Sequence, residues 1–237
     1  MNKRTGAVAG IVSLVLSFGS FALAPPPPAP DAATADWLRW YAENPGGIQA
    51  LAFVFGLTVL AFLVWFGAVR SHVWRGADAA PLAPIATVGM AIMTIGWLTA
   101  SGISSAVALR VDELGADVVV FAAVLAGVLS AAAQFGLAAT MGAVSAQAHA
   151  QATLPRWLVA TGGIGAVLAT ATGVGVASDG GFVMPLVFAS WLVTTVWVVG
   201  ISVVLWKGAA AESHAPAGGA DRAAADNRAP MVSALGG

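Results

Sequence analysis

Long apolar runs separated by short polar segments dominate the chain. None of these runs contains Asp, Glu, Lys, Arg or His, and they cover residues 7–24, 48–69, 82–109, 118–146, 157–177 and 182–206. A membrane-spanning helix needs ~20 mostly apolar residues because the hydrocarbon core is ~30 Å thick. Uninterrupted runs favour helices over the alternating strands of a membrane barrel. The pattern therefore predicts an all-α, polytopic transmembrane helix bundle of about six spans, forming one domain over residues 1–207.

The first run has a second interpretation. Lys3, Arg4 and a short apolar core that ends at Ala22–Leu23–Ala24 resemble a secretory signal peptide. Pro25 would be the first residue after the cut, where signal peptidase tolerates proline poorly. We expect the segment to remain as a spanning helix. Its removal would leave five spans and a new N-terminus outside.

Basic residues near the span ends predict the orientation. Lys and Arg near span ends stay on the cytoplasmic side. With both termini inside, eight basic residues are cytoplasmic and two are outside. The eight are Lys3, Arg4, Arg70, Arg75, Arg156, Lys207, Arg222 and Arg228, and the two are Arg39 and Arg110. This bias predicts an N-in/C-in topology. The preference for Ala, Gly and Val, and for Arg over Lys, fits a high-GC bacterial genome, so we expect the bacterial cytoplasmic (inner) membrane.

The predicted outer loop, residues 25–47, begins with the proline run Pro25–Pro28, which favours extended geometry. Thr34 is expected to cap a short helix, which Asn44–Pro45–Gly46–Gly47 then breaks. Helical spacing would place three aromatic side chains on one face: Trp37, Trp40 and Tyr41. We interpret this stripe as an anchor in the outer headgroup region. A ligand-binding aromatic lid is the alternative.

Other tryptophans lie near the predicted cytoplasmic ends and fit an aromatic belt. They are Trp65, Trp74, Trp157 and Trp206. The tail, residues 208–237, is rich in Ala and Gly, and we expect it to be disordered and cytoplasmic.

Composition excludes several classes of protein. The chain is 59% hydrophobic and only 9% charged, whereas soluble domains are ~45–50% apolar and ~25% charged. The net charge of −1 gives no reason to expect nucleic acid as a partner. The chain has no cysteine, so disulfides, thiolate metal sites and a cysteine nucleophile are excluded.

The histidines do not form an evident cofactor site. His72, His149 and His214 fall in parts of the chain predicted to be cytoplasmic, whereas a haem needs histidines inside the spans. His149, near Gln147 and Gln151, is the only one that merits a metal test. We therefore assign no catalytic, cofactor-binding or metal-binding residue.

The polar side chains predicted to lie at membrane depth are all neutral. The most polar are Gln134, Thr58 and a serine cluster of Ser101, Ser104 and Ser105. Ion-coupled carriers and intramembrane proteases need ionisable groups or a base at this depth, and the spans contain none. Gln134 is expected to hydrogen-bond a neighbouring helix. Contact with a substrate is the alternative.

Small residues recur at a spacing of four, which lets two helices approach closely. The sets are Gly165, Ala169 and Gly173; Ala171 and Gly175; and Ala123, Gly127 and Ala131. We expect them to pack helices within the bundle, with homodimerisation as the alternative.

Three segments carry a family resemblance: residues 40–50, residues 62–70, and Leu154–Pro155–Arg156–Trp157–Leu158. Together they resemble a group of uncharacterised actinobacterial membrane proteins with six predicted helices. The resemblance covers most of residues 1–206 and implies the same topology. That family has no established activity, so the resemblance implies no functional residue.

Two functions remain as hypotheses, and an enzyme is the least expected. The first is a non-enzymatic accessory or regulatory membrane component, with the lipid bilayer and a membrane protein or a second copy as partners. The alternative is a permease-like protein for a neutral or lipophilic small molecule, with Gln134 and the serine cluster lining its cavity.

Overall fold

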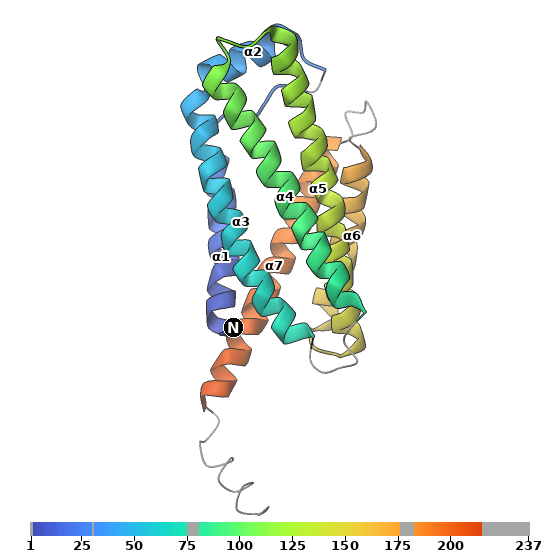
Figure 1. Ribbon diagram of the computed structural model, residues 1–237. Coiled ribbons are helices and arrows are strands. Elements are labelled where there is room, and N and C mark those ends of the chain that lie inside the picture. Colours follow the sequence, from blue (N-terminus) through green and yellow to red (C-terminus); the bar gives the residue numbers. More distant parts are fainter. Residues whose placement is uncertain (1, 30, 75–80, 176–182, 215–237) are drawn as a thin grey trace, which may run out of the picture.

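The computed structural model describes residues 2–29, 31–74, 81–175 and 183–214, and these form seven helices without a strand (Figure 1). The helices are α1 (Lys3–Ser20), α2 (Thr34–Glu43), α3 (Pro45–Val73), α4 (Leu82–Arg110), α5 (Ala116–Ala150), α6 (Arg156–Gly175) and α7 (Val183–His214). Each of the six apolar runs corresponds to one long helix, and α2 lies in the predicted outer loop. The prediction of an all-helical protein is confirmed.

Five helices, α3 to α7, are long and apolar enough to cross a membrane. The described part of α1 has 18 residues and includes Lys3 and Arg4. Its length is about 27 Å at ~1.5 Å per residue, close to but below the thickness of the hydrocarbon core. The length and charge of α1 thus set it apart from the other five.

Three boundaries differ from the sequence prediction. The first run was expected over residues 7–24, but α1 starts at Lys3 and ends at Ser20. Only Asn44 separates α2 from α3, because Pro45 starts α3, a position where its missing N–H costs nothing. At the other end α7 continues to His214, past residue 208 where the tail was expected to begin. Residues 215–237 of the predicted tail lie outside the described residues.

The six long helices form a closed ring in the order α1, α3, α4, α5, α6, α7, and α7 returns to α1 (Figure 1). The order departs from the chain order only in that α2 lies across one end of the ring. There α2 contacts α3, α4 and α5. The ring encloses a central space that side chains fill at one end and leave open near the other.

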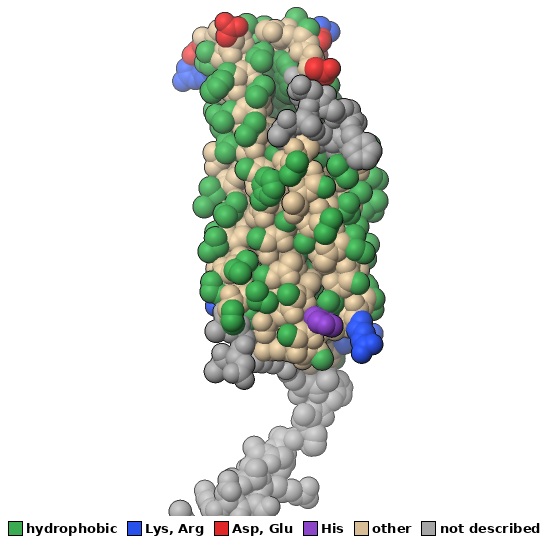
Figure 2. Space-filling model, turned by 90° about the vertical axis from the view of Figure 1, so that its right-hand side faces the viewer, with side chains coloured by type: hydrophobic (Ala, Val, Ile, Leu, Met, Phe, Trp, Pro, Cys, Tyr) green, Lys and Arg blue, Asp and Glu red, His purple; other side chains and the backbone are tan. Residues whose placement is uncertain are grey.

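Charged residues gather at the two ends of the bundle and leave the apolar sides between them (Figure 2). One end, here called the basic end, carries Lys3, Arg4, Arg70, Arg156 and Lys207. The other, the acidic end, carries Asp31, Asp36, Glu43, Asp112, Glu113 and Asp117, together with Arg39 and Arg110. The halves of the bundle next to these ends are called the basic half and the acidic half.

Large side chains fill the centre of the basic half. Trp65 and Trp197 are fully buried and meet edge to face with ring centroids 5.6 Å apart. Met141, Ile201 and Leu205 are also fully buried beside them. The expectation that Trp65 belongs to a lipid-facing belt is therefore wrong. Trp157 and Trp206, each about half exposed, do face outward.

Close helix contacts depend on glycine. One close backbone approach joins α4 to α5, where a Cβ at Gly136 would lie 2.5 Å from the Gly89 carbonyl oxygen. The predicted set in α6 is also used inside the bundle: a Cβ at Gly165 would clash with Met141, and one at Gly173 with Phe135. In α5, by contrast, Gly127 is exposed and has no atom within 4 Å of an added Cβ.

The aromatic stripe of α2 packs inward and does not face the headgroup region as expected. Trp37 is 8% exposed and Tyr41 only 1% exposed. They form a cluster with α3, α4 and α5 that contains Ile48, Val107, Ala108, Val119 and Ala123. The indole Nε1 of Trp40 donates to the Pro25 carbonyl at 3.2 Å. The stripe thus holds α2 and the proline segment onto the acidic end.

Candidate functional site

A cavity of about 350 Å³ occupies the acidic half of the ring. Five helices form its wall, and only α6 of the ring takes no part. Its hydroxyl groups come from Ser13, Ser17, Ser20, Thr58, Ser101, Ser130, Thr194 and Thr195. Its aromatic side chains are Phe21, Phe55, Phe62, Trp97 and Trp191, and its aliphatic ones are Leu14, Leu51, Val59, Met93, Leu137 and Val198. The volume lies at the lower end of small-molecule sites, which occupy ~300–1,000 Å³.

Helical periodicity explains which residues reach the cavity. In α4, Met93, Trp97 and Ser101 follow one another at intervals of four and therefore lie on one face. In α1, Ser13, Ser17 and Ser20 do the same at intervals of four and three. Each helix thus presents one mixed face of hydroxyls and apolar groups to the centre.

Side chains shared with the packed core close the cavity toward the basic end. Phe62 lines the cavity and also stacks on Trp65, with centroids 4.8 Å apart. Met93 and Leu137 likewise belong to both the cavity wall and the buried core. The cavity therefore ends where the filled basic half begins.

Four of the eight cavity hydroxyls donate to their own helix. Thr58 donates to the Val54 carbonyl at 3.0 Å and Thr194 to Ser190 at 2.8 Å. Ser13 and Ser20 donate to carbonyls three residues earlier, each at 2.7 Å. A hydroxyl has a single proton but two lone pairs. These four groups can still accept a hydrogen bond, but they have no further proton to give.

The seam between α1 and α7 changes along its length. Near the basic end the helices touch closely, since a Cβ at Gly10 would clash with the hydroxyl of Ser202. At the level of the cavity, aromatic rings bridge them: Phe18 and Phe21 contact Trp191 at centroid distances of 4.2 and 5.6 Å. Phe18 and Phe21 are 48% and 66% exposed. Aromatic side chains thus separate this part of the cavity from the outside of the bundle.

The predicted polar residues are only partly brought together. Thr58 and Ser101 line the cavity, whereas Ser104 hydrogen-bonds to Tyr41 and Ser105 is not part of the wall. Gln134 lies in α5 between Ser130 and Leu137, on the same helix face. Its Oε1 atom is buried and has no hydrogen-bond partner among the described residues.

Sequence reasoning missed the serines of α1 and the threonines of α7. Ser13, Ser17 and Ser20 recur at helical spacing in a run that also resembled a signal peptide, and that spacing is the signal that could have identified them. Thr194 and Thr195 stand side by side in an otherwise apolar run. Hydroxyls in spans often bond only to their own backbone. The sequence therefore does not distinguish a hydroxyl that bonds to its own helix from one that lines a cavity.

The phenol of Tyr41 lies outside the spanning helices, in the cluster beneath α2. Burial raises the pKa of Tyr41 above its usual value, and the hydrogen bond with Ser104 partly opposes that shift. Burial disfavours the charged phenolate, so the neutral form stabilises this end of the fold.

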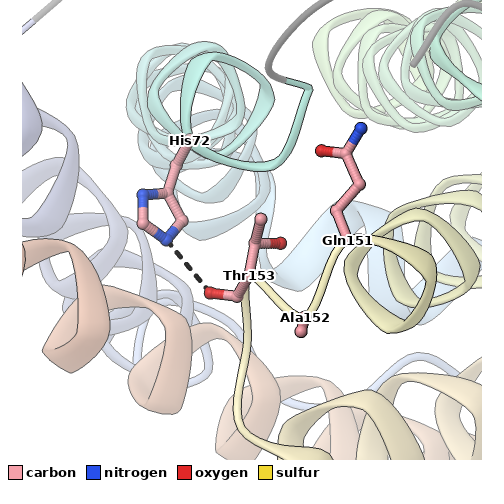
Figure 3. Close-up of a pocket in the computed structure, with 4 residues that line it drawn as sticks. All are labelled: His72, Gln151, Ala152 and Thr153. Carbon is pink, nitrogen blue, oxygen red and sulfur yellow. Dashed lines mark hydrogen bonds between the residues drawn. The ribbon is translucent and has the colours of Figure 1, made fainter. Parts of the chain in front are cut away.

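A second, wide hollow of about 630 Å³ lies at the basic end and is lined by His72, Gln151, Ala152 and Thr153 (Figure 3). The Nε2 atom of His72 is 3.3 Å from the Thr153 carbonyl, which ties the end of α3 to the α5–α6 turn. Ala152 in this turn has a φ of 50°. The histidine thus helps to hold a turn in place.

The described residues contain no group of three His, Asp or Glu side chains that could hold a metal ion. His149, the candidate for a metal test, is exposed in the last turn of α5. The side chain of His214 lies outside the described residues.

Comparisons with protein-family models, curated proteins and solved structures return no match to this chain. The resemblance based on residues 40–50, 62–70 and 154–158 therefore stays an expectation. Function has to be argued from the geometry of the bundle.

Proposed function

We propose that this protein is a non-enzymatic, permease-like membrane protein that binds a neutral, lipophilic small molecule within its helix bundle. The cavity in the acidic half supports this function. It lies inside a ring of six helices, five of which are long and apolar enough to span a membrane, and its wall combines hydroxyls with aromatic rings. Small-molecule sites typically combine an apolar wall with a few polar groups in this way.

The lining chemistry supports a neutral occupant. The described wall contains no Asp, Glu, Lys, Arg or His. A charge at membrane depth is costly unless a partner charge or water compensates it. Access from the bilayer is supported at the α1–α7 seam, where the exposed rings of Phe18 and Phe21 adjoin the cavity residue Trp191.

A cavity-filling substitution tests the proposed function. In Ser130→Phe, a large ring should occupy the cavity from the α5 side, so the thermal stabilisation of the purified protein by a lipophilic solute should disappear. Val128→Phe is the matched control, because Val128 is on the same helix and 48% exposed outside the cavity. Equal stabilisation of both variants and the unmodified protein would overturn the proposal.

The six-span, N-in/C-in topology belongs to the same proposal. Arg39 and Arg110 are at the acidic end, but each pairs with a carboxylate three residues away, Asp36 at 2.9 Å and Glu113 at 2.6 Å. The basic end is therefore the more positive one, which supports placing it in the cytoplasm of a bacterial cell. A reporter that works only outside the cytoplasm should be inactive when fused after Lys207.

Packing of α1 supports its retention as the sixth span. A Cβ at Gly6 would clash with Ala68 of α3, and Ala7 is buried in the core. Three cavity serines also come from α1. Intact-mass measurement of protein purified from membranes should therefore show residues 1–24 still attached, and a mass that lacks them would contradict this part of the proposal.

An accessory or regulatory component is the second candidate function. The exposed glycine Gly127 on α5, with the exposed Val124 and Val128 beside it, supports it. Helices can approach closely at such a site. A protein that co-purifies after mild detergent extraction, and is lost in Gly127→Leu, would favour this function.

A further inference from the structure

We infer that the cavity selects molecules that donate a hydrogen bond, such as a single-chain lipid alcohol, over equally apolar molecules that can only accept one. This inference rests on the proposed function, because it specifies the chemistry of the ligand in the same cavity. It is based on the acceptors to which the hydroxyl groups of the cavity wall donate their protons.

Hydrogen-bond acceptors outnumber donors in this cavity. Four hydroxyls donate their single proton to a carbonyl of their own helix: those of Ser13, Ser20, Thr58 and Thr194. Only lone pairs remain for a ligand at these four positions. The other four hydroxyls of the wall can donate or accept, and the indole N–H groups of Trp97 and Trp191 can only donate. The wall therefore offers eight acceptor hydroxyl oxygens and at most six donors, four hydroxyls and two indoles. A ligand with an O–H or N–H group therefore finds more partners than a ligand with only an ether or ester oxygen.

The difference in affinity between the two kinds of ligand depends on the free energy of the hydrogen bond that an acceptor-only ligand fails to form. At the four positions whose protons are already donated to a carbonyl, an acceptor-only ligand meets lone pairs and gains no replacement for the hydrogen bond that water would have supplied. One net hydrogen bond contributes ~0.5–1.5 kcal/mol, which corresponds to roughly two- to tenfold in affinity.

The shape of the site favours a slender amphiphile. Hydroxyl-bearing residues alternate with large apolar ones such as Phe55, Trp97 and Leu137 around a volume of about 350 Å³. A single alkyl chain with one polar head group satisfies both kinds of wall. A two-chain lipid would exceed a cavity of this size.

The test compares dodecanol with dodecyl methyl ether, which differ mainly in the O–H donor. The full-length protein in lipid nanodiscs is titrated with each probe at equal mole fractions in the bilayer, and the apparent Kd is taken from the rise in the thermal unfolding midpoint. Dodecanol should bind about two- to tenfold more tightly than the ether.

Two variants locate the preference. In the double variant Ser13→Ala, Thr58→Val, two acceptors are removed with little change in volume, so the ratio of the two affinities should fall toward one. Thr87→Val is the matched control, because Thr87 donates to the Ala83 carbonyl at 2.9 Å in the same manner but is exposed and outside the cavity. It should leave the ratio unchanged. Binding of the ether to the double variant shows that the cavity persists.

The outcomes separate the inference from the proposed function. If both probes bind with equal affinity and Ser130→Phe abolishes both, the cavity binds lipophilic molecules but the donor preference is wrong. If neither probe binds, the proposed function fails with it. If the preference survives in the double variant, or is lost in Thr87→Val, the selection arises elsewhere and the inference is overturned.

Discussion

The two halves of the bundle are built from the same helices but use their centres differently. In the basic half, Trp65, Trp197 and Met141 fill the space between helices, and each is fully buried. In the acidic half, serines and threonines share the inward positions with aromatic and aliphatic side chains, and a cavity remains between them. Protein interiors normally pack without large voids. The contrast indicates that the basic half holds the ring together and that the acidic half is free to receive a ligand.

Phe62 marks the boundary between the halves. Its ring stacks on Trp65 on one side and lines the cavity on the other. Substitutions on either side of it should therefore have different consequences: loss of stability in the basic half, and changes in binding in the acidic half.

The largest effect is expected from tryptophan truncation in the basic half. Trp197→Ala should destabilise the fold by about 3–5 kcal/mol, because it opens a cavity in a fully packed core. Trp191→Ala, at the wall of the existing cavity, should cost only about 1–2 kcal/mol, because its surroundings are already partly open. Reversible unfolding in mixed detergent micelles measures both. Equal losses would remove the distinction between the halves.

A smaller effect is expected at the α4–α5 contact. Gly136→Ala should destabilise by about 1–3 kcal/mol, because the new Cβ would lie 2.6 Å from the backbone nitrogen of Met93, which has little freedom to move. Gly127→Ala on the same helix should be neutral or stabilising by up to ~1 kcal/mol, since nothing lies within 4 Å of its added Cβ. The same unfolding assay compares the pair, and a neutral Gly136→Ala would contradict the close contact.

A gain in stability is expected at the turn of the basic end. Ala152 has a φ of 50°, a conformation that costs a non-glycine residue ~1–2 kcal/mol. Ala152→Gly should therefore stabilise by about 0.5–1 kcal/mol after allowance for glycine's greater loss of entropy. Ala146→Gly, at an exposed position within α5, should instead destabilise by about as much. Destabilisation by both substitutions would show that the turn carries no strain.

The smallest effect, visible only in alkali, concerns Tyr41 at the acidic end. Because burial raises its pKa, the neutral phenol contributes stability that is complete below the usual tyrosine pKa of about 10 and is lost as pH rises through the folded-state value. Thermal stability should therefore fall above about pH 10, and less steeply in Tyr41→Phe.

Tyr41 is the only tyrosine of the chain. Its ionisation can therefore be followed directly by ultraviolet difference absorbance in the folded protein. A titration at or below the pKa of a free tyrosine would contradict its burial beneath α2.

The hydrophobic pattern alone predicted the number of long helices, their approximate limits and the sorting of charge to the two ends. Apolar runs without ionisable residues leave few alternatives to helices in a membrane, because every backbone group must find a partner within its own segment. The errors fall where short-range signals compete. The motif Asn44–Pro45–Gly46–Gly47 was expected to end the short helix, and α2 does end at Glu43. The next helix was expected from residue 48 but begins at Pro45, because proline is well suited to the first position of a helix.

Which helix faces meet and which remain open became evident only from the packing of the helices. A membrane-spanning helix is apolar on its lipid side as well as on its buried side, so its hydrophobic pattern does not identify the inward face. Trp65 was therefore assigned to the lipid belt although it is the centre of the core, and the serines of α1 were overlooked. The ring order brings Ser13, Thr58 and Thr194 from three distant parts of the chain into one cavity. Their shared position depends on helix packing, which the sequence pattern leaves undetermined.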